Sequence, residues 1–547
     1  MEGYLVVNKK ANYDAIVIGT GFSGMYMLHL LRKMGLRTRA FETGADVGGV
    51  WYWNRYPGLR CDSESVFFNY TFSEELYKGW TWSSRYPEQP EILRYLNYVA
   101  DKLDLRKDIQ FNTKIVSAIY NEESNLWDIE TSNGEIVTSK YIVTGLGTLS
   151  DSNVPNLKGL GQFEREWHHT GKWPHEPVDF SGKRVGVIGT GSSGIQVIPI
   201  IAESANHLTV FQRSPQYTIP ARNKPLSPEY IQEIKENFQE FAREVRYETF
   251  GGAIVRLPTK SVLEVTEEER QQVYKEYWEM GGPLLTFSFT DLATSPEANK
   301  TASDFVKQKI RETVKNPVVA EKLIPNYPIG AKRIVVDTGY YKTFNRDNVT
   351  LHDVKEDPII EITSTGIQTN NGHVELDMIV FATGYDAITG PLLRMNIQGR
   401  NGITLKEKWD NGKNLKTLLG VANNGFPNMF TITGPQSPAV LGNVPVLIEQ
   451  HVEWIAECIR YLEENNIDLI ESTKEAEDNW AEHTNEVAKY EFYSDQDSWY
   501  TGANIEGKEK AILVYRGGFQ NFRQKCDEVA NSGYKGFNLV SYSKQSK

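Results

Sequence analysis

Two glycine-rich loops constrain the fold of this chain more than any other feature of its sequence. The first loop, Gly19–Gly24, follows the apolar run Ala15–Ile18 and precedes a segment with helical spacing, Met25–Met34. A second strand-like run, Arg37–Phe41, then ends at Glu42. This order of strand, glycine loop, helix, strand and acid is typical of a dinucleotide-binding unit, in which glycines let the backbone approach a pyrophosphate. The helix N-terminus supplies N–H groups to the phosphates. The candidate nucleotide contacts here are Gly19, Gly21, Ser23, Gly24 and Glu42.

The second loop, Gly189–Gly194, repeats this arrangement, but no acidic residue follows its second strand. It follows the strand-like run Arg184–Ile188, precedes a helical segment, and leads to a further strand, Leu208–Phe211. The position that matches the acid of the first copy is Gln212, and Arg213 follows it. A guanidinium there can bind a 2′-phosphate that a carboxylate would repel, so the pattern favours FAD at the first loop and NADPH at the second. The candidate contacts are Gly189, Thr190, Gly191, Ser192, Ser193, Gly194, Ile195, Arg213 and Ser214.

The rest of the chain predicts an α/β fold with two Rossmann-like domains. Apolar strands at Tyr141–Thr144 and Met378–Phe381 each end in a glycine turn, and each is expected to return the chain to one of the two sheets. Charged segments with helical spacing lie between them and predict a helical insertion in the NADPH domain. The expected divisions are 1–150 and 386–547 for the FAD domain, 151–221 and 331–385 for the NADPH domain, and 222–330 for the helical subdomain.

Composition excludes several other classes of protein. The 547 residues carry a net charge of −12, which does not favour a nucleic-acid binder. Cys61, Cys458 and Cys526 form no metal-binding or redox spacing, and we interpret them as reduced thiols in a cytoplasmic protein. Neither a signal peptide nor a membrane-spanning helix is expected. We expect no metal and no membrane partner, and a monomer or a weak homo-oligomer.

Two further segments resemble the Baeyer–Villiger monooxygenases. The segment Phe163–Pro174 matches that family's fingerprint at Phe163, His169 and Trp173, although Arg165 stands where the family has glycine. The segment Gly48–Asp62 matches a second family signature without a mismatch. The resemblance covers nearly the whole chain and extends to the phenylacetone, cyclohexanone and steroid enzymes of the family.

The resemblance implies an enzyme that converts ketones to esters or lactones with molecular oxygen. In this family NADPH reduces FAD, and a flavin peroxide then attacks the ketone to give a tetrahedral adduct that rearranges. By resemblance Arg333 stabilises the negative charge, a role for which a permanently protonated guanidinium is suited. Asp62 matches the family aspartate that holds this arginine. The alternative from the residues alone is that Asp62 or Ser63 caps a short helix and that Lys332 and Arg333 are solvated.

The remaining site residues come from the same resemblance. Lys332 joins Arg213 and Ser214 as a candidate for the 2′-phosphate, and Arg333 also counts among the cofactor contacts. Trp499 matches a tryptophan that contacts the nicotinamide nucleotide, or it is simply packed in the FAD domain. His169 is expected to be a linker residue with satisfied hydrogen bonds. Further candidate contacts near the flavin are Val50, Trp51, Trp53 and Asp62. The segment that resembles the ketone-lining part of the family is Ser437, Pro438, Ala439, Val440 and Leu441.

Three other functions share part of this pattern. A flavin-containing or N-hydroxylating monooxygenase acting on amines or sulfides has both loops, but the presence of Asp62 and Arg333 favours ketone oxidation. A disulfide reductase needs two neighbouring redox cysteines, which the sequence does not offer. A nucleotide-sensing protein without turnover would not couple NADPH oxidation to oxygen uptake.

Overall fold

The computed structural model describes residues 11–542 of the chain. Its largest sheet contains β1, which lies between β2 and β6 and is parallel to both. The order across the sheet is β17-β4-β5-β6-β1-β2-β3, and β18 also pairs with β6. The strands are β1 (Tyr13–Ile18), β2 (Thr38–Phe41), β3 (Ile109–Gln110), β4 (Ile115–Asn121), β5 (Leu126–Thr131), β6 (Ile136–Thr144), β17 (Asn396–Gln398) and β18 (Met429–Thr431). The predicted return of the chain to this sheet at Tyr141–Thr144 is therefore confirmed.

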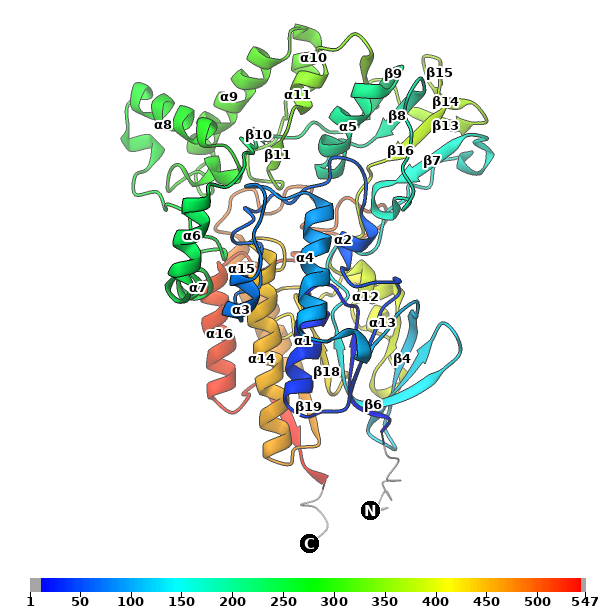
Figure 1. The fold of residues 1–547 in the computed structure, drawn as a ribbon, viewed down its shortest axis with the longest axis vertical. Helices are drawn as coiled ribbons and strands as arrows, with labels where there is room; N and C mark the ends of the chain where they lie inside the picture. Colours follow the sequence, from blue (N-terminus) through cyan, green and yellow to red (C-terminus); the bar gives the residue numbers. More distant parts are fainter. Residues whose placement is uncertain (1–10, 543–547) are drawn as a thin grey trace.

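The second main sheet is wholly parallel and has the order β12-β9-β8-β16-β7. Its strands are β7 (Glu166–His169), β8 (Arg184–Ile188), β9 (His207–Gln212), β12 (Val349–Asp353) and β16 (Met378–Phe381). The predicted return at Met378–Phe381 is confirmed, since β16 pairs with β8. Figure 1 shows this sheet at the end of the molecule opposite β4 and β6, with α2 (Val50–Trp53) between the two regions.

Smaller sheets and helices complete the two main layers. Three short sheets are formed by β10 (Thr218–Pro220) with β11 (Val335–Asp337), by β13 (Ile359–Thr363), β14 (Gly366–Thr369) and β15 (His373–Glu375), and by β19 (Leu469–Ser472) with β20 (Phe537–Val540). The helices outside the 222–330 segment are α1 (Phe22–Lys33), α2, α3 (Glu74–Lys78), α4 (Gln89–Lys102), α5 (Ser192–Ser204), α11 (Tyr340–Thr343), α12 (Gly390–Arg394), α13 (Leu405–Lys408), α14 (Val444–Glu464), α15 (Lys474–Ala488) and α16 (Phe519–Asn531).

The segment 222–330 is helical, as its spacing predicts, and its first helical stretch is divided into two helices. Asn237 separates α6 (Pro228–Glu236) from α7 (Phe238–Tyr247), and its backbone (φ −98°, ψ 25°) leaves the helical region there. The helices that follow are α8 (Glu267–Met280), α9 (Pro296–Thr313) and α10 (Pro317–Lys322). The apolar face of α6 and α7 packs on Val446 and Leu447 of α14, which joins this segment to the region of the first sheet.

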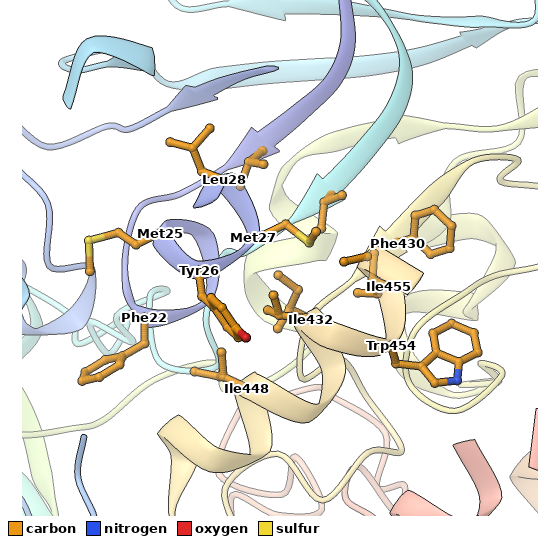
Figure 2. Close-up of a cluster of buried hydrophobic side chains, with 14 of the residues drawn as sticks. Phe22, Met25, Tyr26, Met27, Leu28, Phe430, Ile432, Ile448, Trp454 and Ile455 are labelled. Atoms are coloured by element: carbon orange, nitrogen blue, oxygen red, sulfur yellow. The ribbon is translucent and has the colours of Figure 1, made fainter. Parts of the chain in front are cut away.

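The core beneath the first loop is built by α1 and α14. Figure 2 shows side chains of α1, among them Tyr26 and Met27, meeting Ile448 and Ile455 of α14 and Ile432 beyond β18. The Tyr26 hydroxyl donates a hydrogen bond to Glu453 at 2.9 Å. This packing fixes α1, and with it the loop at its N-terminus, against a long helix from the far end of the chain.

Cys61, Cys458 and Cys526 are buried and are free thiols in the structure. Among residues 11–542 no helix combines the length and apolar character needed to cross a bilayer.

Candidate active site

The first loop is closed by contacts between backbone atoms that only glycine permits. The N–H of Gly19 donates to the carbonyl of Phe41 at 2.8 Å, which ties the loop to β2. A Cβ on Gly24 would lie 1.8 Å from the carbonyl oxygen of Gly19. Gly21 faces Gly49, with the position of a Cβ 3.4 Å from the Gly49 Cα, and Gly49 itself has φ of 54°. Two glycines from separate segments therefore leave bare backbone on both sides of this cradle.

Glu42 is held rigidly at the ribose end of the first loop. Its side chain is buried, and one carboxylate oxygen accepts hydrogen bonds from the N–H and hydroxyl of Thr20 at 2.9 and 3.0 Å. The other oxygen accepts from the N–H of Gly44 at 2.7 Å. A carboxylate held in this way keeps lone pairs in a fixed direction, which suits recognition of a diol.

The helices that follow the two loops begin without side-chain caps. The N-cap is Gly21 in α1 and Gly191 in α5. In the described part of the chain, neither helix has a side-chain cap on its first turn. By contrast, Ser227, Thr266 and Thr473 cap other helices through their hydroxyls. The first-turn N–H groups of α1 and α5 are thus available to an anionic ligand, and this arrangement fits a dinucleotide pyrophosphate at each loop.

The second loop repeats the geometry of the first but is more open. The N–H of Gly189 donates to the carbonyl of Phe211 at 3.0 Å, and a Cβ on Gly194 would lie 2.3 Å from the Gly189 carbonyl oxygen. A Cβ on Gly191, in contrast, would meet no described atom within 4 Å. The hydroxyl of Thr190 donates to the carbonyl of Ser214 at 2.9 Å, which brings two predicted contacts together.

The ribose end of the second loop is cationic. The Gln212 side chain is buried and its amide donates to the carbonyl of Lys322 at 2.7 Å, whereas Arg213 is exposed. Burial and the neighbouring Arg213 guanidinium lower the pKa of Lys332, with Lys355 adding to the effect and Asp497 opposing it. Two of the three predicted 2′-phosphate residues therefore lie close enough to repel one another, which an anion between them would relieve.

Asp62 and Arg333 form a bidentate ion pair. Nε of Arg333 donates to one carboxylate oxygen of Asp62 at 2.6 Å and Nη2 donates to the other at 2.7 Å. Nη1 donates to the carbonyl of Val440 at 2.7 Å. Arg333 is therefore not a solvated charge. The alternative that Asp62 or Ser63 caps a helix is also wrong, because no helix of the described chain begins there.

Each member of the pair stabilises the charged form of the other. Burial disfavours the charge on both groups, but the Arg333 guanidinium more than offsets it and lowers the pKa of Asp62. Burial likewise opposes the charge of Arg333, and Asp62 outweighs it to raise the pKa of that guanidinium. Arg333 thus remains protonated, and a carboxylate directs its plane.

The predicted ketone segment lies beside this pair. Ser437, Ala439 and Val440 are almost fully buried, and the carbonyl of Val440 is the third acceptor of Arg333. Leu441 is partly exposed. The backbone of Ala439 has φ of 44°, in the left-handed region, so the segment follows an irregular path towards the guanidinium.

The other predicted cofactor contacts, Val50, Trp51, Trp53 and Trp499, lie in different surroundings. Trp51 is half-buried against Phe68, with ring centroids 5.6 Å apart, and its carbonyl accepts from Gln89 at 2.5 Å. Trp53 is exposed, and Val50 is partly exposed. Trp499 packs on the ring of Tyr500 at 4.4 Å. The contacts of these residues with a cofactor stay predictions.

The fingerprint segment forms the edge of the second sheet and a tight turn after it. His169 is buried; its Nδ1 accepts the Gly171 N–H at 2.9 Å, and its Nε2 lies 3.2 Å from the Thr383 hydroxyl. Burial lowers the pKa of His169 to about 4, so the ring is neutral, as a linker residue with both nitrogens partnered requires. Phe163 and Trp173 are buried in separate apolar clusters. Arg165 is exposed and its φ is not positive, which explains why a glycine is not needed there.

Besides the bond from Arg333 to the Val440 carbonyl, two contacts of the site were not predicted. Tyr500 is buried beside Arg333. Burial raises the pKa of Tyr500 and Arg333 opposes this rise, while Tyr500 helps to raise the pKa of Arg333. The hydroxyl of Tyr56 donates to Gln196 of α5 at 2.8 Å, and the Gln196 amide donates to the carbonyl of Arg60 at 3.0 Å. These bonds connect the second loop's helix to the segment that carries Asp62. Only the position of Tyr500 next to Trp499 could have signalled the first contact, and nothing local could have signalled the second.

Comparison with known proteins agrees with this geometry. Residues 12–250 match the family described as FMO-like, flavin-binding monooxygenase-like. Cyclohexanone 1,2-monooxygenase of Acinetobacter sp. is 44% identical over 97% of this chain and 98% of its own length. A Baeyer-Villiger monooxygenase of Pseudooceanicola batsensis is 45% identical over 96% of both chains. Phenazine N-monooxygenase PhzNO1 of Lysobacter antibioticus is 43% identical over 98% of this chain and 99% of its own.

Solved structures give the same result. Oxidized steroid monooxygenase bound to NADP superimposes with a TM-score of 0.91 at 49% identity and covers 97% of this chain and 99% of its own. OTEMO in complex with FAD and NADP gives a TM-score of 0.94 at 39% identity, over 97% of this chain and 100% of its own. Likeness of this extent along the full chain is more than a shared fold, and the chain belongs to the Baeyer–Villiger monooxygenase family of flavin-binding monooxygenases.

Proposed function

We propose that this chain is an FAD-containing, NADPH-dependent monooxygenase that converts ketones to esters or lactones. The observation that carries the proposal is the Asp62–Arg333 pair. It holds a permanently charged guanidinium between the Val440 carbonyl and Asp62, which follows the first loop in the sequence. Relatives that are 44 and 45% identical have names that specify this chemistry.

Each loop holds one dinucleotide in this proposal. Gly19, Gly21, Ser23 and Gly24 receive the FAD pyrophosphate, and Glu42 accepts hydrogen bonds from its ribose. The second loop receives the NADPH pyrophosphate, and Arg213, Ser214 and Lys332 bind the 2′-phosphate. When bound, the nicotinamide supplies a hydride and the flavin supplies activated oxygen for transfer to the ketone.

Arg333 acts on the oxygen that gains negative charge as the ketone carbonyl is attacked. Three of its N–H donors are engaged by Asp62 and Val440, which fixes the plane of the guanidinium and the direction of the remaining donors. Asp62 offsets the cost of desolvating the guanidinium. Tyr500 closes another side of the group and helps to exclude water.

The proposal also covers the ketone site, the division into domains, and the oligomeric state and location of the protein. Ser437–Leu441 line the ketone site, and Trp499 contacts the nicotinamide nucleotide. The FAD domain comprises 1–150 and 386–547, the NADPH domain 151–221 and 331–385, and the helical subdomain 222–330. We expect a monomer or weak homo-oligomer in the cytoplasm, a location supported by the three buried, unpaired thiols.

A second candidate function is oxygen transfer to an aromatic nitrogen. It is favoured by one specific observation, the 43% identity to a protein named phenazine N-monooxygenase over nearly the full chain. Such a reaction needs no oxyanion at the carbonyl position, so the bidentate pair around Arg333 favours the ketone.

A substrate panel tests the proposal. Purified protein is incubated with NADPH, oxygen and linear, cyclic or aromatic ketones, and with phenazine in a parallel arm. Ester, N-oxide, NADPH loss and hydrogen peroxide are measured together. Ester formation in step with NADPH loss supports the proposal, whereas N-oxide without any ester, or peroxide alone, would contradict it.

A further inference from the structure

The loop of residues 433–442 carries the carbonyl that orients Arg333, and its backbone is unusual. Thr433, Gln436 and Ala439 all have positive φ, at 50°, 65° and 44°. None of these residue types favours the left-handed region, so each position must be held there by the surroundings. Since the Val440 carbonyl accepts from Nη1 of Arg333 at 2.7 Å, the path of this loop decides where the third bond of the guanidinium points.

The side chain of Gln436 holds the first half of this loop. Its Oε1 accepts a hydrogen bond from the N–H of Thr417 at 3.0 Å and lies 3.1 Å from the Thr417 hydroxyl, and its Nε2 donates to the carbonyl of Leu415 at 3.2 Å. The Thr417 hydroxyl is also 2.9 Å from the carbonyl of Pro435. Both Gln436 and Thr417 are almost completely buried, so these bonds face no competition from bulk water.

The backbone of Gln436 is held as well. Its N–H donates to the carbonyl of Leu513 at 2.8 Å, and its carbonyl accepts from Nε1 of Trp480 at 3.1 Å. At the other end of the loop, the Asn443 side chain donates to the carbonyl of Phe67 at 2.5 Å. Between these anchors, residues 438–442 make one hydrogen bond to another element of the described chain, the one from Arg333.

We propose that Gln436 is a positioning residue of the ketone site, because its side-chain amide fixes the path of the 433–442 loop and so the carbonyl that orients Arg333. The inference rests on the proposed function. Arg333 is then oriented from two sides, by Asp62 and by a loop whose shape depends on Gln436. Loss of the amide should displace the carbonyl and misdirect the remaining donors of the guanidinium, while the two nucleotide loops stay intact.

The experiment compares Gln436→Met with a matched control, Asn428→Leu. Methionine keeps the length of the side chain and removes the amide. Asn428 is also buried with positive φ (56°), and its amide bonds the backbone at Asp468 and Ile470, away from the 433–442 loop. Both variants should lower the melting temperature. Only Gln436→Met should lower the ratio of ester to NADPH consumed, by about tenfold, as expected for a misplaced catalytic group.

Two further readouts separate positioning from a general loss of stability. Anaerobic flavin reduction by NADPH should stay near the wild-type rate in both variants. Amide hydrogen exchange at Ala439–Leu441 should become faster only in Gln436→Met. If Gln436→Met does not fold, Thr417→Val removes the hydroxyl bonds, with Thr417→Ser as the conservative variant that should restore coupling.

The outcomes separate a failure of this inference from a failure of the proposed function. Wild-type protein that forms no ester would overturn both. The second outcome is that the wild-type protein forms ester and that Gln436→Met or Thr417→Val gives the same ratio of ester to NADPH consumed as Asn428→Leu. This outcome would overturn the role of Gln436 and leave the proposed function intact.

Discussion

The first and second loops have the same backbone plan and differ in what surrounds them. In both, the last residue of the leading strand pairs in parallel with a phenylalanine, Ile18 with Phe41 and Ile188 with Phe211. In both, the first glycine donates to that phenylalanine's carbonyl. The first loop then leads to a buried carboxylate held by three hydrogen bonds, and the second leads to a buried amide next to an exposed arginine.

The covering of the loops differs too. Gly21 faces Gly49 at close range, so the first cradle is enclosed by the turn before α2, whereas Gly191 has open space around it. An enclosed cradle suits a nucleotide that stays bound, and an open one suits a nucleotide that exchanges in each cycle. Strand, glycine loop and helix are thus common to both sites, whereas the flanking residues set the charge at the ribose end and the enclosure of the cradle.

Gly24→Ala and Gly194→Ala should have the largest effects and separate the two loops. Each new Cβ would collide with the carbonyl of the first loop glycine, at 1.8 and 2.3 Å, which costs about 3 kcal/mol of stability in a packed site. Gly24→Ala should yield protein without flavin. Gly194→Ala should remain yellow but fail to be reduced by NADPH. Flavin absorbance and anaerobic reduction measure both, and equal flavin loss in the two variants would contradict the assignment.

Glu42→Gln should come next. The new amide cannot accept from Thr20 and Gly44 together, so buried donors lose a partner, at a cost of about 2 kcal/mol. We expect weaker retention of FAD, measured as flavin released on dilution or mild heating, with the KM for NADPH little changed. A change in that KM as large as the loss of flavin would count against assigning FAD to the first loop.

Arg213→Gln should weaken NADPH by about tenfold, a modest value because the exposed side chain is screened by solvent. NADH lacks the 2′-phosphate, so its KM should hardly move. The ratio of the two KM values is the measurement, and similar losses for both nucleotides would refute the role of Arg213.

A pH dependence should be the smallest effect. Burial and Arg213 lower the pKa of Lys332, so this ammonium loses its charge at a lower pH than an ordinary lysine. As pH rises through that range the cation disappears, and the Kd for NADPH should increase about threefold. The dependence should be shallower for NADH and for Lys332→Gln. A wild-type profile identical to that of Lys332→Gln would show that Lys332 is not involved.

The strands and both loops could be predicted from sequence because each depends on local spacing. β8 begins and ends where the pattern predicts, and β6 and β16 return to the expected sheets. The break at Asn237 was not predicted, since an asparagine between two amphipathic stretches is equally compatible with one helix.

The pairing of Asp62 with Arg333 was expected only through the family resemblance, because their separation in sequence carries no local signal. The contact of Arg333 with the Val440 carbonyl could not be predicted at all. It depends on left-handed backbone at Gln436 and Ala439, which those residue types do not favour and which distant residues impose. The link from Tyr56 to Gln196 likewise arises only when the two regions are brought together.

The most direct test of the account is Arg333→Ala, studied with a ketone that the wild-type protein oxidises. The guanidinium lies outside both nucleotide loops, so NADPH should still bleach the flavin of the variant under anaerobic conditions. In the presence of oxygen, NADPH consumption should then yield hydrogen peroxide and no ester. Ester formation by Arg333→Ala at the wild-type rate would contradict the central claim, that a guanidinium held by Asp62 makes oxygen transfer to the ketone possible.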